Sequence, residues 1–209
     1  TGTVALSVDD PRANLPSSVT FGPQSGGSRE LSVVFGTLGV RTVAATLDGF
    51  SDDAATTVTV GAPHHIVLTD DGAATTGVPH AVTVTVVDAF DHPLDTPASA
   101  YTGTVTFSLA GSTPDLAPTL PGPTTFTAAD IGEREVNTTW FRRGVWRLRA
   151  TGTGLVVASA TLDIDVALSP GMTLELDVPA NTKAGVPADV TVTVRDGQGN
   201  VATGFTGTV

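Results

Sequence analysis

Hydrophobic and polar residues alternate along much of this chain, with the two-residue period of a β-strand that buries one face. Residues 81–88 and 189–196 show this period most clearly, because valine alternates with threonine in both. The apolar positions are Val82, Val84 and Val86 in the first segment and Val190, Val192 and Val194 in the second. Both segments are therefore predicted to be strands with one buried and one solvated face.

A second pair of segments shows the same period. The residues that share one face of each predicted strand are Leu31, Val33 and Phe35 in the first and Val136, Thr138 and Trp140 in the second. Trp140 is therefore expected in a hydrophobic core. Glycine, proline and aspartate interrupt the apolar runs about every ten residues, which is typical of an antiparallel sandwich.

The sequence also repeats itself over long distances, which is the mark of a tandem architecture. Three sets of segments match: Thr-Gly-Thr-Val at 1–4, 102–105 and 206–209, residues 20–50 with 125–155, and residues 77–88 with 185–196. The period is about a hundred residues, the size of one immunoglobulin-like sandwich. We therefore predict an all-β protein made of immunoglobulin-like antiparallel β-sandwich modules in tandem.

Module boundaries are expected where proline interrupts strand pairing between two modules. Residues 61–65 and 167–171 have this character. The predicted organisation is the C-terminal part of one module in 1–61, a complete module in 62–168, and the N-terminal part of a further module in 169–209.

Composition narrows the range of partners. The net charge of −11 and the isoelectric point near 4.4 argue against nucleic acid, whose phosphates an acidic surface repels. The chain has no cysteine, which excludes disulfides and thiolate metal sites. No apolar run approaches the roughly 18 residues of a membrane-spanning segment, so no transmembrane segment is expected in this chain.

Two stretches resemble the bacterial immunoglobulin-like repeats of cell-surface and secreted proteins. They are "DGQGNVATGFTGTV" at 196–209 and "TFTAADIG" at 125–132. The resemblance extends over essentially the whole chain and implies a stalk, spacer or adhesive module at an extracellular or cell-surface location. The segment 88–105 departs from the repeat, because its turn carries Asp91 and His92 where residues 199 and 200 are glycine and asparagine.

No arrangement of residues predicts catalysis, since no nucleophile, base and orienting group recur together, and we expect no enzyme. A zinc site at His64 and His65 is disfavoured, because adjacent strand residues point to opposite faces. Calcium is the better-motivated cofactor, through the acidic pairs at 52–53, 70–71 and 163/165. The alternative is that these aspartates form turns and solvated faces, with no cofactor at all.

The candidate interaction residues lie in one stretch. They are Arg142, Arg143, Trp146, Arg147 and Arg149. Arg147 and Arg149 are predicted on the solvent face of a strand, where charges resist edge pairing. Alternatively, the four arginines form, together with Arg134, a basic stripe that meets the acidic surface of a neighbouring subunit. Trp146 is expected at the rim of the sandwich, where it could stack against a sugar.

Two functions remain open at this stage. The first is a non-catalytic structural or adhesive repeat of an extracellular surface protein or fibre, associating with neighbouring repeats or with itself. In that reading the partial modules at 1–61 and 169–209 could complete each other between chains, head to tail. The alternative is a carbohydrate- or receptor-binding accessory module of a larger secreted protein.

Overall fold

The computed structural model describes residues 2–111, 117–203 and 205–208. Thr1 and Val209, which belong to the first and last Thr-Gly-Thr-Val copies, lie outside the described residues. The prediction of an all-β fold is confirmed: the described residues form antiparallel sheets and one short 3-10 turn at Ala128–Asp130. No helix in these ranges is long and apolar enough to cross a membrane.

The chain forms two compact units. The N-terminal unit contains residues 1–62 together with 88–92, and the C-terminal unit contains residues 63–87 and 93–209. The boundary between them is therefore crossed after residues 62, 87 and 92. The predicted division into 1–61, 62–168 and 169–209 follows sequence repeats and stays a prediction.

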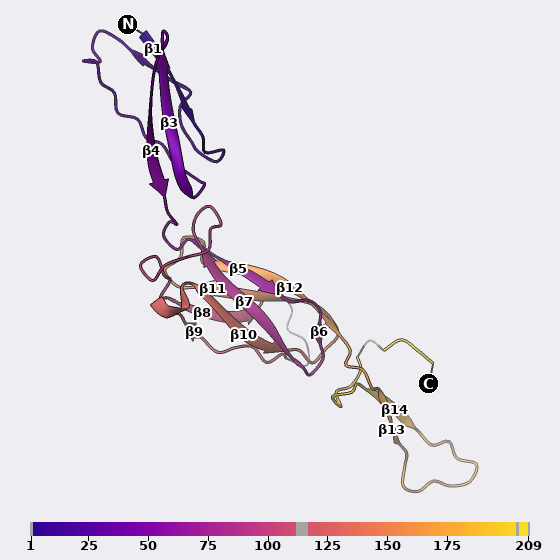
Figure 1. The fold of residues 1–209 in the computed structure, drawn as a ribbon. Helices are drawn as coiled ribbons and strands as arrows, with labels where there is room; N and C mark the ends of the chain where they lie inside the picture. The colour runs from indigo at the N-terminus through magenta and orange to yellow at the C-terminus, as the bar shows by residue number, and fades with distance from the viewer. Residues whose placement is uncertain (1, 112–116, 204, 209) are drawn as a thin grey trace. The chain divides into compact units, whose positions relative to one another are not determined.

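The N-terminal unit has one four-stranded antiparallel sheet in the order β2-β1-β3-β4 (Figure 1). The strands are β1 (Gly2–Val8), β2 (Ser18–Phe21), β3 (Gly39–Leu47) and β4 (Phe50–Val58). Side chains alternate along β1, with Val4, Leu6 and Val8 half-buried on one face. This face carries the apolar residues of the sheet, and no second sheet covers it within the described part of the unit.

The prediction of a strand at residues 31–35 is wrong for this unit. Residues 28–33 form no strand, and Val34 makes only an isolated bridge to Asn14. The matching residues Glu133–Thr139 do form a strand, β10, because they pair with β7 (Pro79–Val87). The local sequence is therefore not sufficient to form this strand, which also needs the edge of a neighbouring strand to pair with.

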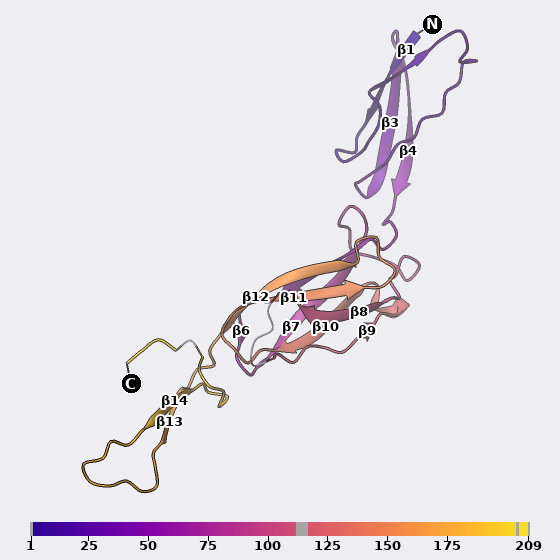
Figure 2. The same ribbon diagram turned by 180° about the vertical axis from the view of Figure 1, so that it is seen from behind.

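The C-terminal unit contains a complete sandwich of two sheets, which are antiparallel except for the parallel β6–β12 pair and are seen from opposite sides in Figures 1 and 2. One sheet has the order β10-β7-β5, with β5 at His65–Asp70. The other has the order β6-β12-β11-β8-β9. Its strands are β6 (Ala74–Thr75), β12 (Ser159–Ala167), β11 (Gly144–Gly152), β8 (Thr104–Leu109) and β9 (Thr124–Thr125).

The core of the sandwich lies between these sheets, at the positions that the alternation predicted. Val82, Val84 and Val86 of β7 are fully buried, and so are Leu148 of β11 and Trp140. The indole Nε1 of Trp140 donates to the hydroxyl of Thr138 at 2.8 Å, which satisfies the polar atom that this large side chain brings into the core.

The same unit also contains a two-stranded hairpin, β13 (Thr173–Asp177) with β14 (Thr191–Arg195). Its apolar side chains are exposed, including Leu174, Leu176, Val190 and Val192. The hairpin repeats β5 and the C-terminal half of β7 in sequence, but in the described residues it has neither a third strand nor a covering sheet. An isolated hairpin of this kind is marginally stable in water.

Candidate functional site

The predicted interaction residues Trp146 and Arg147 lie on β11, beside β12. Trp146 points inward at the rim, as expected, and is half-buried, while its Nε1 donates to the backbone carbonyl of Arg142 at 2.8 Å. Arg147 points outward and forms two hydrogen bonds with Asp163 of β12, at 2.6 and 2.7 Å. A shallow cavity of about 330 Å³ opens here, lined by Ala110, Val145, Trp146, Arg147 and Asp163.

The arginines do not combine into one basic surface. Arg147 is neutralised by Asp163 across the sheet, and its hydrogen bonds lower the pKa of that carboxyl and raise the pKa of the guanidinium. Arg134 donates to the carbonyl of Thr125 and pairs with Asp130 at 3.6 Å. The remaining predicted residues are Arg143 and Arg149, which are exposed, and Arg142, which is half-buried in the turn before β11.

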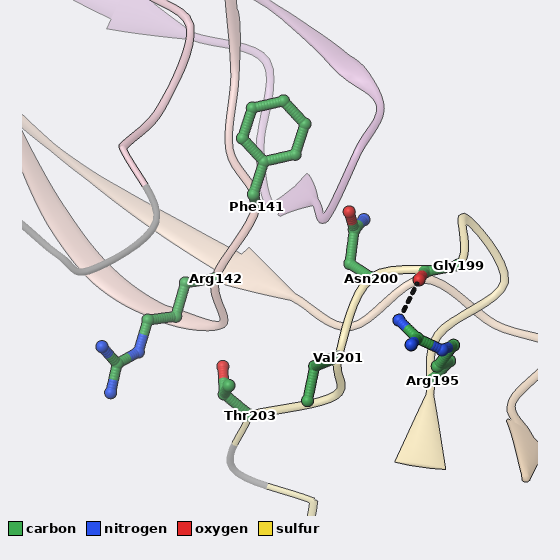
Figure 3. A pocket seen from close by; sticks show the side chains of 7 residues that line it. All are labelled: Phe141, Arg142, Arg195, Gly199, Asn200, Val201 and Thr203. Carbon is green, nitrogen blue, oxygen red and sulfur yellow. Dashed lines mark hydrogen bonds between the residues drawn. The ribbon is translucent and has the colours of Figure 1, made fainter. Parts of the chain in front are cut away.

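Arg142 lines a second, larger hollow of about 460 Å³, shown in Figure 3. The other residues around it are Phe141, Arg195, Gly199, Asn200, Val201 and Thr203. Arg195 donates to the carbonyl of Gly199 at 3.1 Å, and the Arg142 side chain points away from it (Figure 3). The two cations therefore do not converge on a common ligand position.

A buried carboxylate closes the turn beside this hollow. Asp196 follows β14, and its Oδ1 accepts hydrogen bonds from the amides of Gln198 and Asn200, both at 2.9 Å. Its Oδ2 accepts from the hydroxyl of Thr76, which in turn accepts from the amide of Ser169 at 2.9 Å. Because Thr76 belongs to the complete sandwich, this network ties the hairpin to the sandwich within the C-terminal unit.

The same network is built a second time, within the N-terminal unit. Oδ1 of Asp88 accepts from the amides of Phe90 at 2.8 Å and His92 at 3.0 Å, the same relative positions that Asp196 uses. Oδ2 accepts from the amide of Gly61 and from Nδ1 of His92, both at 3.0 Å. His92 thus replaces Asn200 in function, although the turn sequences differ. We name these two networks the aspartate joints.

Both aspartates are held ionised by these donors. Burial by itself would raise the pKa of Asp88, but the amides of Gly61, His92 and Phe90 and the His92 ring outweigh it and lower the pKa to about 2. Burial likewise opposes ionisation of Asp196, and the Thr76 hydroxyl together with the turn amides lowers its pKa. Each carboxylate is therefore a structural acceptor with few lone pairs left for a ligand.

One glycine makes a close approach possible at the Asp196 joint. Gly77 has a φ of 73°, and a Cβ there would lie 2.8 Å from the Cβ of Gln198. Its counterpart Gly185 has a φ of 81° but open space around it. Gly77 is therefore needed for both its backbone conformation and its contact, whereas Gly185 is needed for conformation alone.

The histidines lie differently from the sequence prediction. His64 precedes β5, so the argument that its side chain and that of His65 point to opposite faces is wrong. The two Nδ1 atoms are 3.1 Å apart and the rings meet edge to face. Nε2 of His80 contacts Oδ2 of Asp70 at 3.0 Å.

One member of each acidic pair proposed for calcium is engaged with a protein group. Asp70 bonds His80, both oxygens of Asp163 bond Arg147, and Asp52 accepts from the amide of Asp53. Within residues 2–111, 117–203 and 205–208, no three histidine or acidic side chains gather closely enough to hold a metal ion.

The sequence prediction missed the aspartate joints. The signal was present, because Asp88 and Asp196 end the two copies of the repeated segment 77–88 and 185–196. Their burial could not be seen, since the donors come from residues 61 and 76, far away along the chain.

Solved structures with similar arrangements of β-modules come from several kinds of protein. The S-layer protein rSbsC is similar over 95% of this chain and 24% of its own, with 14% identity and a TM-score of 0.36. Invasin, described as a bacterial integrin-binding protein, is similar over 99% and 41%, with 16% identity and a TM-score of 0.40. A beta-glycosidase from Bacteroides vulgatus is similar over 79% and 21%, with 16% identity and a TM-score of 0.41.

This chain thus spans about a quarter of the length of the S-layer protein and about a fifth of the glycosidase. No family model and no curated protein matches the sequence.

Proposed function

We propose that this chain is a non-catalytic structural repeat of an extracellular surface protein or fibre. The observation that carries the proposal is the aspartate joint, which is built twice on the same pattern of turn amides. In each, a buried carboxylate uses its lone pairs on the turn and on a connection outside it. Such a joint fixes backbone position and offers nothing to a substrate.

Further support comes from the Asp196 joint within the C-terminal unit. There the turn after β14 is bonded to Thr76 of the sandwich, which restrains the hairpin more than a single flexible linker would. Resistance to bending is what a stalk or fibre requires.

The joint at Asp196 can be tested by spin-label distances. The chain has no cysteine, so Thr161→Cys and Asp177→Cys place one label on the sandwich and one on the hairpin without background. We expect a narrow distance distribution in the otherwise unaltered chain. Gly77→Ala should broaden it, because the added Cβ meets Gln198.

Gly185→Ala is the matched control, since it introduces the same positive-φ strain in open space. It should leave the distribution narrow. A broad distribution without any substitution at Gly77, or equal broadening by both alanine variants, would contradict a rigid joint.

The structure also favours a second candidate function, a carbohydrate- or receptor-binding accessory module. Trp146 and the Arg147–Asp163 pair meet in an open cavity, and an aromatic ring beside planar polar groups suits stacking and hydrogen bonding to a sugar. On this proposal Trp146→Ala abolishes binding in a glycan array, whereas Arg149→Ala on the same strand preserves it. Absence of glycan binding by the unaltered chain would exclude the sugar ligand.

We propose in addition that the structural repeat self-associates head to tail, with partial modules completing each other between chains. The supporting observation is that the N-terminal sheet and the β13–β14 hairpin both expose apolar side chains. Light scattering at increasing protein concentration tests this, since open-ended association gives a mass that keeps rising.

A further inference from the structure

Two imidazole rings meet where β5 begins, within the C-terminal unit. The Nδ1 atoms of His64 and His65 are 3.1 Å apart, and the rings contact each other edge to face with their centroids 5.3 Å apart. Neighbouring side chains on a regular strand would point to opposite faces and could not share a ligand. Because His64 lies just before the strand, its ring instead lies beside that of His65.

The backbone beneath the two rings is fixed on both sides. The amide of His64 donates to the carbonyl of Val87 at 2.8 Å, and its carbonyl accepts from the amide of Val157 at 3.0 Å. His65 is paired with Val87 in the antiparallel β5–β7 register and forms an isolated bridge with Val157. Segments on either side therefore hold both histidines in place, so a ligand at the rings would require little movement of the chain.

The spacing of the two nitrogens suits adjacent positions around one metal ion. An imidazole nitrogen lies about 2.0–2.1 Å from a bound divalent metal, so two nitrogens at the observed separation would subtend an angle of roughly 100° at the ion. This angle lies between those of tetragonal and tetrahedral coordination. The side chains can therefore bind the same ion without a change of backbone.

The environment favours an exchangeable ion over a structural one. Both rings are half-buried, so they are partly shielded from water while an ion can still reach them. A structural zinc site uses four protein ligands, whereas no group of three histidine or acidic side chains gathers in the part of the chain that the structure describes. A two-histidine site leaves further coordination positions for water or other oxygen ligands.

We propose that His64 and His65 bind one copper(II) ion through their Nδ1 atoms. Imidazole suits the late first-row metals, and among the divalent ions of that row copper(II) has the highest affinity for a given nitrogen site. Binding requires the hydrogen of each neutral ring to be on Nε2, so the ion replaces the hydrogen bond between the two Nδ1 atoms. This proposal is independent of the structural function, because neither aspartate joint includes these two residues.

Titration of the full chain with copper(II), followed by isothermal titration calorimetry, tests the proposal. The unaltered chain should bind one ion at this site. His65→Thr introduces the residue found at the matching position 173. It should weaken binding by roughly 10- to 100-fold or more, because even the loss of a residue that supports a metal ligand has an effect of this size.

His92→Asn is the matched control for the titration. It also removes one imidazole, and Asn200 occupies the corresponding place in the other aspartate joint. Copper(II) binding by this variant should equal that of the unaltered chain. Equal affinities of the unaltered chain and His65→Thr would overturn the proposal.

Electron paramagnetic resonance of the copper-loaded chain distinguishes a paired site from binding at a single imidazole. The nitrogen superhyperfine pattern should lose one nitrogen in His64→Ala and one in His65→Thr, and it should be unchanged in His92→Asn. A pattern that either of the first two substitutions leaves intact would show that the two rings do not share the ion.

A further measurement tests whether folding creates the site. The unfolded chain keeps the two histidines adjacent in sequence, but nothing there holds their Nδ1 atoms 3.1 Å apart. A ligand that binds the folded state preferentially stabilises it, so copper(II) should raise the urea midpoint, followed by circular dichroism, in the unaltered chain and in His92→Asn but not in His65→Thr. An unchanged midpoint in the unaltered chain would contradict a site formed by the fold.

Discussion

Asp88 and Asp196 are buried acids whose role is to accept hydrogen bonds. Each bonds the amides two and four residues ahead and a donor from a distant segment. A carboxylate suits this task because it has acceptors on both oxygens and no donor. An amide side chain of the same shape would turn one oxygen into a donor facing other donors.

Asp196→Asn should therefore destabilise the C-terminal unit. The new NH₂ group would face a hydroxyl or a turn amide, which leaves a buried polar group unsatisfied at a cost of about 1–3 kcal/mol. Urea unfolding followed by tryptophan fluorescence measures this, since both tryptophans lie in this unit. Asp95→Asn, at an exposed position, is the control; equal losses in both variants would contradict the assignment.

Acid should weaken the N-terminal unit through Asp88. The pKa is lowered to about 2 in the folded chain, against about 3.9 in an unfolded one, so the unfolded state binds the proton more readily. The stabilisation, roughly 2 kcal/mol, is complete above about pH 5 and is lost as the pH falls through 4 and below 2. An NMR titration of the Asp88 carboxyl should give a midpoint near pH 2, and a midpoint near 4 would refute this assignment.

At the scale of elements, the alternation predicted the strands of the complete sandwich and their buried faces. Val82, Val84, Val86 and Trp140 are in the core as expected. It failed at residues 28–33, although their pattern matches that of β10. The reason is physical: a strand gains its hydrogen bonds from a neighbour, and periodicity carries no information about whether that neighbour is present.

The candidate site was predicted only in part, because the sequence shows which way a strand's side chains point but not which residues of the neighbouring strand they face. The alternation of side chains along the strand predicted that Arg147 and Arg149 point outward and that Trp146 lies at the rim, which the structure confirms. It could not show that Arg147 faces Asp163 on β12, because register between strands depends on the β11–β12 turn. The predicted basic stripe consequently carries less net positive charge than the sequence implied, because Asp163 compensates Arg147.

The Arg147–Asp163 pair should contribute little to stability despite its short bonds. Both side chains are about half exposed, and ion pairs of this kind are screened by water and salt. A double-mutant cycle with Arg147→Ala and Asp163→Ala should give a weak coupling that disappears in 1 M salt. A strong coupling that persists at high salt would indicate a more buried pair.

For the whole molecule, the sequence predicted the all-β class and the repeat, both of which depend on long segments. It did not predict that residues 88–92 group with 1–62. That grouping arises from contacts such as Arg12 with the carbonyl of Phe90 at 2.8 Å, which join residues 78 positions apart and leave no trace in local periodicity.

Removing calcium should not alter the stability of the chain. One aspartate of each pair that suggested a site is already bonded, to His80, Arg147 or a neighbouring amide. Differential scanning calorimetry with and without a chelator should give the same transition. A lower transition temperature in the chelator would show that calcium binds and would revive the metal hypothesis.

The contrast between β10 and residues 28–33 bears on how such repeats are synthesised. Within a module the receiving edge, β7, precedes β10 in the chain, so a ribosome delivers the template before the segment that needs it. Until the back half of a module emerges, its front hairpin displays unsatisfied amides and bare valines, a surface prone to mispairing. Translation pauses midway through a repeat should therefore promote aggregation more than pauses at a module boundary.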